Sequence, residues 1–324
     1  MNILLTSGGR RVALLKAFRA ALKKLGQAGQ ILVADLSPLS SAYQIADIQV
    51  AVPRCLEPGY VDRLLDICTA HEVKLLVPLI DTELAVLAAA HDRFKAIGTT
   101  VVISSLEAIT LSRDKRKTAT FFESCGLATP KVLDFDRAIS GAYEFPLFLK
   151  PADGSSSIGS RRIDDVEELR FFWPRTKNPM LLECLTGVEY TVDVYSGLDG
   201  TVHCAVPRRR VEVRAGEVSK GLTEQVPAVI EAATKAAKAL PGARGVLTFQ
   251  CMLSDDGTPY FFELNARFGG GAPLSIHAGA DFPRWLLEET QGRAPSVGSP
   301  PFRPRTLMLR YDDAVFLDEA GRWL

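Results

Sequence analysis

The alternation of short apolar runs with longer amphipathic stretches over roughly the first 105 residues constrains the fold more than any other feature of this sequence. Apolar runs that predict buried strands occupy 2–6, 30–37, 74–81 and 99–104. Apolar residues recur at helical spacing between them, at 11–26, 60–73 and 82–98. Strands that alternate with helices form parallel βαβ units. The sequence therefore predicts an N-terminal α/β domain with a doubly wound parallel sheet.

The regular alternation of strands and helices ends after residue 105, and the pattern of the remaining sequence predicts an α+β region with antiparallel sheets. Residues 105–126 and 227–242 are expected to be helical, and 145–163 reads as strand, loop, strand. Residues 180–196 alternate like an antiparallel strand pair with Gly187 between the strands. Residues 245–268 predict a hairpin that turns at 254–257.

Composition limits the class of partner and the compartment. Lys plus Arg and Asp plus Glu each number 38, so the formal net charge is zero and no nucleic-acid partner is expected. The six cysteines are scattered without a C-x-x-C pair, which predicts neither a disulfide framework nor a zinc site. We expect a cytoplasmic protein, because the N-terminus does not resemble a signal peptide. We expect no membrane span, because the most apolar stretch, 73–90, carries charged residues.

The first glycine turn, at Gly8 and Gly9, resembles the start of a dinucleotide-binding unit, with Asp35 at the end of the second strand. The dinucleotide fingerprint requires three spaced glycines, and Arg11 and Val12 stand where the third would be. An NAD-linked oxidoreductase therefore remains only a minor hypothesis for the function. Residues that follow strand ends are expected to line one wall of a cleft, and these are Gly8, Arg10, Asp35 and Asp81.

A second loop of small residues, 154–159, follows Lys150 at the end of a predicted strand. Small residues let backbone amides approach an anion, serine hydroxyls add donors, and the lysine supplies a positive charge. The lysine precedes the loop, so the order is not that of a P-loop. A hairpin that folds over a triphosphate and an ordinary surface turn are both compatible with these residues.

Residues 261–271, FFELNARFGGG, place Glu263, Asn265 and Arg267 at alternate positions, and therefore on one face of a strand. Gln250 lies on the partner strand of the same hairpin, so three oxygen-bearing side chains can converge as ligands of the kind Mg²⁺ prefers. Arg267 can hold a phosphoryl oxygen or a developing oxyanion. The glycines leave room for a substrate. A solvated polar face is the alternative, but the apolar flanks argue against it.

Together these stretches resemble the ATP-grasp superfamily over nearly the whole chain, most closely its carbamoyl phosphate synthetase large-subunit branch and the pyrrolysine-biosynthesis ligase. The resemblance implies a pre-ATP-grasp α/β domain at 1–110 and a small lid subdomain at 111–186. It implies a large subdomain with the metal and catalytic site at 187–324. The chain holds a single ATP-grasp unit, so carbamoyl phosphate synthesis itself is not expected.

The resemblance also carries functional residues to positions in this sequence. The nucleotide-binding positions are Lys115, Lys150, Gly154, Ser155, Ser156, Ser157, Glu183, Leu185 and Glu189. The metal positions are Gln250, Glu263 and Asn265, and the catalytic arginine is Arg267. Candidates for substrate contact come from 206–221, where three arginines share one strand parity, and from the segment after the glycines: Arg208, Arg210, Arg214, Lys220 and Ser275. The sequence offers no role for His203.

The implied function is a ligase that depends on ATP and on magnesium or manganese. Such an enzyme activates a small-molecule carboxylate as an acyl phosphate and joins it to an amine, for example an amino acid. An ATP-binding regulatory or sensor protein without turnover is the alternative. A homodimer is an expectation of the family and not of these residues.

Overall fold

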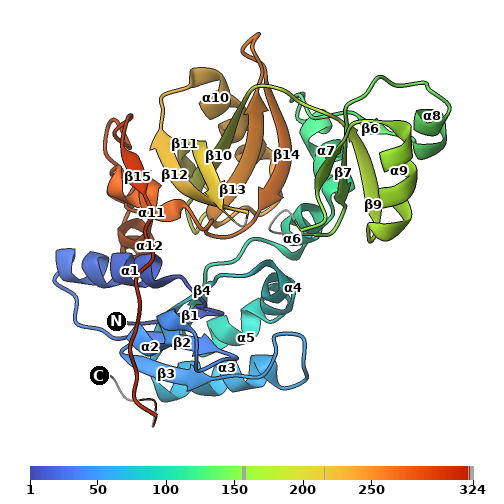
Figure 1. Cartoon of the computed structure of the whole chain (residues 1–324). Helices are drawn as coiled ribbons and strands as arrows, with labels where there is room; N and C mark the ends of the chain where they lie inside the picture. The colour runs from blue at the N-terminus through green and yellow to red at the C-terminus, as the bar shows by residue number, and fades with distance from the viewer. Residues whose placement is uncertain (155–157, 215, 320, 322–324) are drawn as a thin grey trace.

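The computed structural model describes residues 1–154, 158–214, 216–319 and 321, and organises them around three β-sheets. In Figure 1 the N-terminal sheet lies at the bottom, a large sheet lies above it, and a small sheet forms a separate lobe beside the large one. Among the described residues, no helix is long and apolar enough to cross a membrane.

The N-terminal sheet contains five parallel strands in the order β3-β2-β1-β4-β5. Its strands are β1 (Asn2–Thr6), β2 (Ile31–Asp35), β3 (Ile48–Ala51), β4 (Val73–Pro78) and β5 (Thr100–Val101). The strand order reverses between β1 and β4, which is where open α/β sheets bind ligands. The predicted doubly wound parallel sheet is confirmed. Strand β3 and the short helix α2 (Ser41–Ile45) were not predicted.

Both faces of this sheet are covered, as its nearly continuous apolar strands require. Ile3 and Leu5 pack on one face in a buried cluster with α1 (Val12–Lys24) and α12 (Phe282–Thr290). Leu4 packs on the other face in a cluster that includes residues of α3 (Tyr60–Ala70). Helix α12 comes from the end of the chain, so the C-terminal region completes the core of the N-terminal domain.

Two stretches predicted as single helices are each broken in two. Residues 82–98 form α4 (Asp81–Ala89) and α5 (His91–Ala96), because Ala90 leaves the helical conformation. Residues 105–126 form α6 (Leu106–Arg113) and α7 (Lys115–Ser124). The break falls at Asp114, which is extended and whose carboxylate accepts a hydrogen bond from the backbone N–H of Arg116. The apolar period continues across both breaks, so it did not reveal them.

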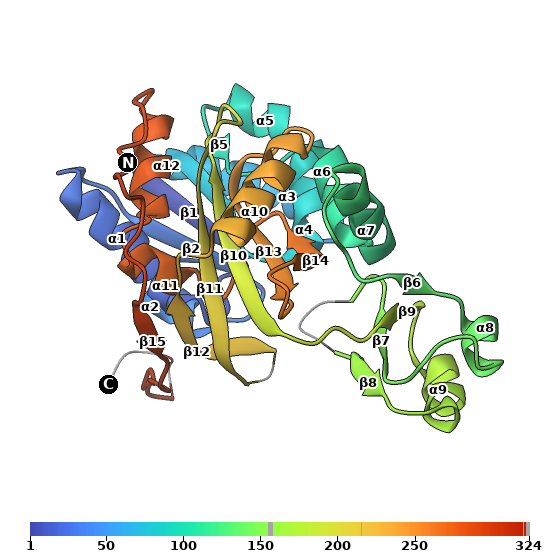
Figure 2. The ribbon, with the colours of Figure 1, turned by 90° about the horizontal axis from the view of Figure 1, so that it is seen from above.

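The small sheet has four antiparallel strands in the order β6-β9-β7-β8. They are β6 (Val132–Leu133), β7 (Leu147–Pro151), β8 (Arg161–Ile163) and β9 (Pro179–Glu183). Helices α8 (Phe135–Ile139) and α9 (Val166–Phe172) and a 3₁₀ turn (Trp173–Arg175) cover one face and share a small apolar core with it. Figure 2 shows this lobe projecting away from the rest of the chain.

The large sheet has six strands in the order β14-β13-β10-β11-β12-β15. Its strands are β10 (Val188–Ser196), β11 (Val202–Arg214), β12 (Glu217–Thr223), β13 (Gly245–Leu253), β14 (Pro259–Asn265) and β15 (Leu307–Leu309). Helix α10 (Pro227–Ala239) packs against β10 and β11. The predicted hairpin of β13 and β14 and the helix at 227–242 are confirmed. Helix α7, which the predicted boundaries assign to the lid, packs against β14, as does α6, which straddles the predicted boundary at residue 110.

The predicted strand pair at 180–196 is wrong. Strand β9 pairs with β6 and β7 in the small sheet, and β10 pairs with β11 and β13 in the large one. Gly187, between them, lies against the backbone of Leu253, where a β-carbon would come within 2.2 Å of the carbonyl oxygen. Alternation identifies strands but not their partners, and here the connection crosses from one lobe to the other.

Glu83, in the first turn of α4, is fully buried and organises the turn between β4 and α4. Its Oε2 accepts hydrogen bonds from the Tyr60 hydroxyl at 2.6 Å and the Ser7 hydroxyl at 3.0 Å. Its Oε1 accepts from the N–H groups of Leu79 and Ile80 at 2.9 and 3.2 Å. Burial raises the pKa of this carboxyl.

We expect Glu83→Ala to lower the free energy of unfolding by about 3 kcal/mol, because it leaves two buried and two partly buried donors without their acceptor. Urea unfolding followed by circular dichroism measures the change. Glu107→Ala, which removes an exposed carboxylate from the first turn of α6, is the matched control and should change little. Equal effects of the two substitutions would contradict a structural role for the buried carboxylate.

Candidate active site

A cavity of about 550 Å³ lies between the small and the large sheets and collects the predicted nucleotide-binding residues. The predicted residues that line it are Lys115, Lys150, Gly154, Glu183, Leu185, Glu189, Gln250 and Glu263. Ser155, Ser156 and Ser157 lie outside the described residues. Two sheets and one helix thus bring together positions up to 148 residues apart in the sequence, since both Lys115 and Glu263 line the cavity.

Apolar side chains that the sequence analysis missed form much of the wall of this cavity: Phe148, Leu182, Met252 and Phe262. Strand parity could have identified two of them. Phe148 precedes Lys150 by two residues on β7, and Met252 follows Gln250 by two residues on β13. A cavity lined by both apolar and charged groups suits a flat, apolar base joined to an anionic group.

Lys150 is buried and Lys115 is half-buried, and neither forms an ion pair with another described residue. Lys150 donates a hydrogen bond to the carbonyl oxygen of Phe262 at 3.4 Å, and its Nζ lies 5.4 Å from the centre of the Phe262 ring. Burial lowers the pKa of Lys150 to about 8, although the charge of Glu263 opposes this change. Burial also lowers the pKa of Lys115, whose ammonium donates to the carbonyl of Gly154. Both groups would be stabilised by an anionic ligand such as a phosphate.

We expect nucleotide affinity to fall above pH 8 because the Lys150 ammonium, whose pKa is lowered to about 8, loses its proton there. The charged fraction drops from about nine tenths at pH 7 to about one tenth at pH 9, so ATP binding in EDTA should weaken about tenfold. Isothermal titration across this pH range measures it. Lys150→Arg keeps its charge, so it should give a nearly flat profile. An equally steep fall in Lys150→Arg would assign the pH dependence to another group.

The resemblance implies that Glu183 and Leu185 meet the adenine at a hinge and that Glu189 meets the ribose. Glu183 and Glu189 lie on either side of the connection between the two sheets. Glu183 Oε1 accepts a hydrogen bond from the backbone N–H of Lys131 at 3.0 Å. Glu189 Oε1 lies 3.1 Å from Nε of Arg210, and burial raises the pKa of Glu189. Arg210 thus holds a half-buried carboxylate at the edge of the cavity. The assignment of Glu183 and Leu185 to the base, and of Glu189 to the ribose, stays a prediction.

The three predicted metal ligands converge through the register of one hairpin. Gln250 is paired directly with Glu263 across β13 and β14, and Asn265 follows Glu263 on the same face. The side-chain Nδ2 of Asn265 donates to Glu263 Oε1 at 2.9 Å, which leaves the amide oxygen of Asn265 without this contact. One carboxylate and two amide oxygens suit a hard divalent cation such as Mg²⁺ or Mn²⁺. Their role as metal ligands stays a prediction.

Arg267 joins this group to the N-terminal domain. Its Nε and Nη2 donate to the two carboxylate oxygens of Asp81 at 2.9 and 2.5 Å, and its Nη1 donates to the carbonyl of Phe268 at 2.9 Å. Asp81 begins α4, directly after the turn that Glu83 organises. A bidentate pair of this kind fixes the plane of the guanidinium. Asp81 was predicted on the wall of a cleft, but its pairing with Arg267 was not predicted.

A second, smaller cavity of about 90 Å³ adjoins the first, since Arg210, Gln250 and Glu263 line both. Asn265, Arg267 and the glycines 269–271 complete much of its wall. A β-carbon at Gly271 would lie 2.2 Å from Nη1 of Arg208, and one at Gly270 would lie 2.6 Å from Nη1 of Arg11. Gly270 and Gly271 therefore lie where two guanidinium groups approach the backbone closely, and a side chain there would displace them.

Arg11 and Glu217 are site residues that the sequence analysis missed. Both line the smaller cavity, and Arg11 Nη1 lies 3.8 Å from Glu217 Oε1. This nitrogen is buried and makes no hydrogen bond within the described part of the chain. Burial lowers the pKa of Arg11. The first glycine turn therefore contributes a cation to the site. Arg10, which was predicted on the cleft wall, is largely exposed.

The structure separates the predicted substrate residues into groups. Arg208 and Ser275 share the fully buried carboxylate of Asp193: Arg208 donates to it at 2.7 and 2.9 Å, and Ser275 at 2.6 Å. Arg208 and Arg210 line the smaller cavity. Arg214 pairs with Asp312, and Lys220 with Glu212, in exposed ion pairs that line neither cavity.

The shared parity of the three arginines does not extend to Arg214. The register between β11 and β12 shifts twice after Arg210, once before and once after Glu212. A register irregularity changes which face the following side chains occupy. Substrate contact by Arg214 and Lys220 therefore has no support in this structure.

The carboxylate of Asp35 accepts hydrogen bonds from backbone groups close to it. Its Oδ2 accepts from the N–H of Gly9 at 2.8 Å and its Oδ1 from the N–H of Ser37 at 3.1 Å. In a dinucleotide site an acidic residue at the end of the second strand would bind a ribose hydroxyl. The contacts of Asp35 therefore argue against the NAD hypothesis.

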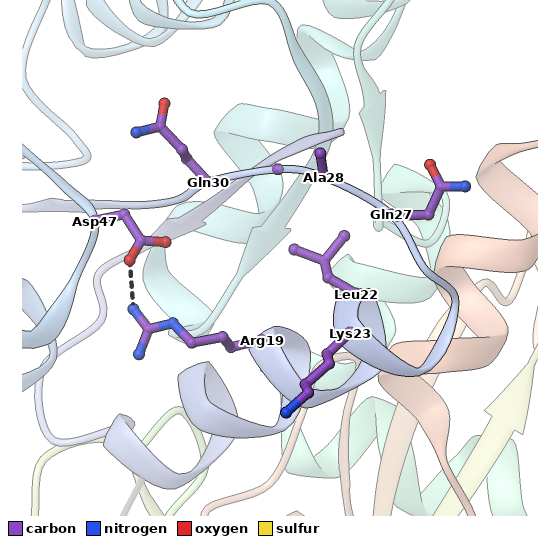
Figure 3. A pocket seen from close by; sticks show the side chains of 8 residues that line it. Arg19, Leu22, Lys23, Gln27, Ala28, Gln30 and Asp47 are labelled. Carbon is purple, nitrogen blue, oxygen red and sulfur yellow. Dashed lines mark hydrogen bonds and ion pairs between the residues drawn. The ribbon is translucent and has the colours of Figure 1, made fainter.

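Another hollow of about 550 Å³ lies beside α1 and contains none of the predicted site residues (Figure 3). Arg19 pairs there with Asp47 at 2.7 Å, next to the loop at 27–30. This ion pair satisfies the two opposite charges, and we assign the hollow no function.

Two family models match the chain. Residues 3–102 match the model described as PylC-like, N-terminal domain. Residues 175–311 match the model described as ATP-grasp in the biosynthetic pathway with Ter operon. The D-alanine–D-alanine ligase of Aromatoleum aromaticum is 29% identical over an alignment of 191 residues, and the match covers 51% of this chain and 60% of that ligase. The corresponding ligase of Streptomyces griseus is 26% identical over an alignment of 266 residues, with 70% of this chain and 66% of that ligase covered. The match thus spans only 60% of the length of the first of these relatives.

Solved structures with similar folds extend over almost the whole chain. The biotin carboxylase domain of Hydrogenobacter thermophilus 2-oxoglutarate carboxylase, in complex with MgADP, ADP and bicarbonate, gives a TM-score of 0.74 at 18% identity. It covers 94% of this chain and 73% of that one. An L-amino acid ligase from Bacillus licheniformis gives a TM-score of 0.71 at 19% identity, with 94% and 77% covered. At these identities the structural matches establish a shared fold.

Proposed function

We propose that this chain, which belongs to the ATP-grasp superfamily, uses ATP to activate a carboxylate as an acyl phosphate and then joins the acyl group to an amine. One observation supports this proposal most strongly. The large cavity and the small one meet at Gln250, Glu263 and Arg210. A triphosphate in the large cavity would therefore present its terminal phosphate to a carboxylate in the small cavity.

The charged residues of the large cavity support roles in holding ATP. Lys115 and Lys150 would neutralise phosphate oxygens, because one is a half-buried and the other a buried cation that an anion would stabilise. Gln250, Glu263 and Asn265 would hold Mg²⁺ or Mn²⁺, which lowers the charge on the phosphates during phosphoryl transfer. The apolar wall from Phe148, Leu182 and Met252 would receive the base.

The proposed reaction has two steps. A carboxylate oxygen of the substrate attacks the γ-phosphorus of ATP, the bond to the bridging oxygen breaks, and ADP leaves. The amine nitrogen then attacks the acyl carbon, inorganic phosphate leaves, and the nitrogen loses a proton. Arg267 would donate hydrogen bonds to the transferring phosphoryl group and to the oxyanion of the tetrahedral intermediate. Asp81, which touches neither, is a positioning residue that orients this guanidinium.

The smaller cavity supports an α-amino acid as one substrate. Arg11 and Glu217 bring a buried cation and an anion to the same wall, 3.8 Å apart. An α-amino acid carries a carboxylate and an ammonium at a comparable separation, so it can pair with both residues at once. The D-alanine ligases and the L-amino acid ligase among the similar proteins bear names that agree with this class.

The test is ADP release with Mg²⁺ across a matrix of carboxylates and amines that includes both D- and L-amino acids. For any productive pair, a carboxylate labelled with ¹⁸O should transfer one labelled oxygen to inorganic phosphate. AMP and pyrophosphate as products, or unlabelled phosphate, would overturn an acyl phosphate mechanism. A flat matrix despite ATP binding would favour an ATP sensor without turnover. The homodimer that the family leads us to expect is tested by the mass of the protein in solution.

A further inference from the structure

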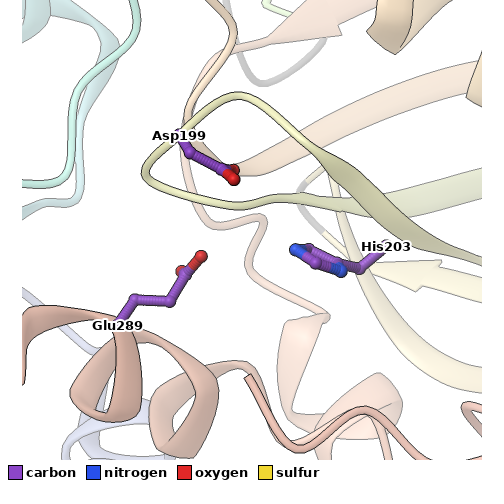
Figure 4. Close-up of side chains that lie close together, drawn as sticks. All are labelled: Asp199, His203 and Glu289. Carbon is purple, nitrogen blue, oxygen red and sulfur yellow. The ribbon is translucent and has the colours of Figure 1, made fainter. Parts of the chain in front are cut away.

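A cluster of three metal-ligating side chains lies on the large sheet and α12, away from the residues that line the two active-site cavities (Figure 4). Asp199 lies in the turn after β10, His203 lies in β11, and Glu289 lies near the end of α12. One ligand atom from each lies within 4.8 Å of the other two. Neither the proposed reaction nor the packing of the fold uses these three groups together.

His203 interacts electrostatically with the nearby Asp199 but makes no hydrogen bond to it among the described residues. Its Nε2 is buried and has no hydrogen bond among the described residues. Its ring lies beside that of Tyr195, with the centroids 5.7 Å apart. Since the ring nitrogen bonds to neither carboxylate, a hydrogen-bonded ion pair does not account for the cluster. A buried imidazole nitrogen that faces two carboxylates without a hydrogen bond is a place where an ordered water or an ion can bind.

The two carboxylates accept hydrogen bonds from residues that do not belong to the cluster, as the ligands of a metal usually do. Glu289 accepts hydrogen bonds from the buried Tyr195 hydroxyl and from the N–H of Leu198. Asp199 accepts from the N–H and the hydroxyl of Thr201 at 2.8 and 2.9 Å. These donors orient the carboxylates and leave them turned toward the histidine (Figure 4).

Gly197 keeps the space between the three ligand atoms open. A β-carbon at this position would lie 2.4 Å from Glu289 Oε1, 2.9 Å from Asp199 Oδ1 and 3.1 Å from His203 Nε2. The φ of Gly197 lies outside the left-handed region, so the backbone conformation does not require glycine. The requirement comes from the approach of the three ligand atoms, and an alanine would intrude among them.

We propose that Asp199, His203 and Glu289 bind a divalent transition-metal ion, with zinc as the best fit, that fastens the β10–β11 turn to α12. One imidazole nitrogen and two carboxylate oxygens are a three-ligand zinc set that leaves a fourth position for water. Magnesium strongly prefers oxygen ligands alone. Tetrahedral zinc would bring the ligand atoms to about 3.4 Å from one another, so the cluster contracts on binding. Because α12 packs on the N-terminal sheet, the ion would reinforce the junction of the two domains.

Zinc binding to the full chain, stripped with a chelator and kept free of magnesium and nucleotide, tests the proposal. We expect one equivalent of ZnCl₂ to bind in isothermal titration and one equivalent of Co²⁺ to give visible d–d absorption. Gly197→Ala keeps all three ligands but fills the space, and His203→Gln removes the imidazole. Each should weaken zinc binding by at least tenfold, which is about the lower limit for loss of an outer-shell partner.

His91→Gln is the matched control, since His91 also lies beside an acid, with Nδ1 3.2 Å from Asp92 Oδ1, but outside the cluster. It should bind zinc like the wild type. If His203→Gln fails to fold, Glu289→Gln replaces it, because its amide oxygen can still accept from Tyr195. Absence of stoichiometric zinc binding, or binding that survives both Gly197→Ala and the ligand substitution, would overturn the proposal. Glu263→Ala should keep full zinc binding, so failure here is distinct from failure of the proposed ligase.

Discussion

Glu263→Ala is expected to abolish ADP formation in a protein that remains folded. Glu263 supplies the only carboxylate among the three predicted metal ligands, and it lies where the two cavities meet. Without it, Gln250 and Asn265 offer two neutral amide oxygens, which hold a divalent cation weakly. A metal ion contributes several kcal/mol to phosphoryl transfer, so we expect a loss on the order of a thousandfold or more.

A coupled ADP assay measures this loss, and thermal unfolding checks the fold. Asp255→Ala, which removes an exposed carboxylate from the turn of the same hairpin, is the matched control and should retain activity. Glu263→Ala should also change nucleotide binding in EDTA. The charge of Glu263 raises the pKa of Lys150, so its removal should move the fall in ATP affinity to lower pH. A folded Glu263→Ala with normal turnover would refute the metal assignment.

Arg267→Ala is expected to lower kcat by a hundredfold or more and to leave the KM for ATP nearly unchanged. Loss of one preorganised donor to a developing oxyanion typically costs about 3 kcal/mol of barrier. Arg267 lines the smaller cavity and not the large one, so ground-state binding of the nucleotide should not depend on it. Product formation under saturating ATP and substrate measures the change.

Arg267→Ala is also expected to lower the stability of the fold. The double variant Arg267→Ala/Asp81→Ala separates this loss of stability from the loss of catalysis. The two side chains are only 13% and 10% exposed, so removing the arginine leaves a largely buried carboxylate unpaired. Breaking such a pair costs roughly 3 kcal/mol or more of stability. The double variant should recover much of that stability and none of the activity. Recovery of both together would mean that Arg267 only supports the fold.

Asp81→Asn should give an activity between those of the wild type and Arg267→Ala. An amide can keep one hydrogen bond to Arg267 but cannot accept from both guanidinium nitrogens as a carboxylate does. We expect a smaller loss of kcat than in Arg267→Ala. This order follows from Asp81 acting through Arg267 and not on the substrate.

The sequence by itself determined the features that depend on neighbours along the chain. The parallel sheet followed from strands alternating with helices, and the β13–β14 hairpin followed from its turn and its apolar flanks. The convergence of Glu263 and Asn265 followed from strand alternation, and their partner Gln250 from the pairing of the same hairpin. The resemblance to a superfamily then gathered Lys115 and Lys150 into one cavity, which periodicity could not do.

Tertiary structure alone decided which distant elements meet. The strands β9 and β10 follow each other closely in the sequence, yet they enter different sheets. Arg11 reaches Glu217, and Asp81 holds Arg267 across 186 residues of sequence. His203 has Asp199 close to it along the chain, across the β10–β11 turn, but it acquires Glu289 only because α12 packs there. The physical reason is that periodicity fixes the side to which a residue points, whereas its partner depends on how whole surfaces pack.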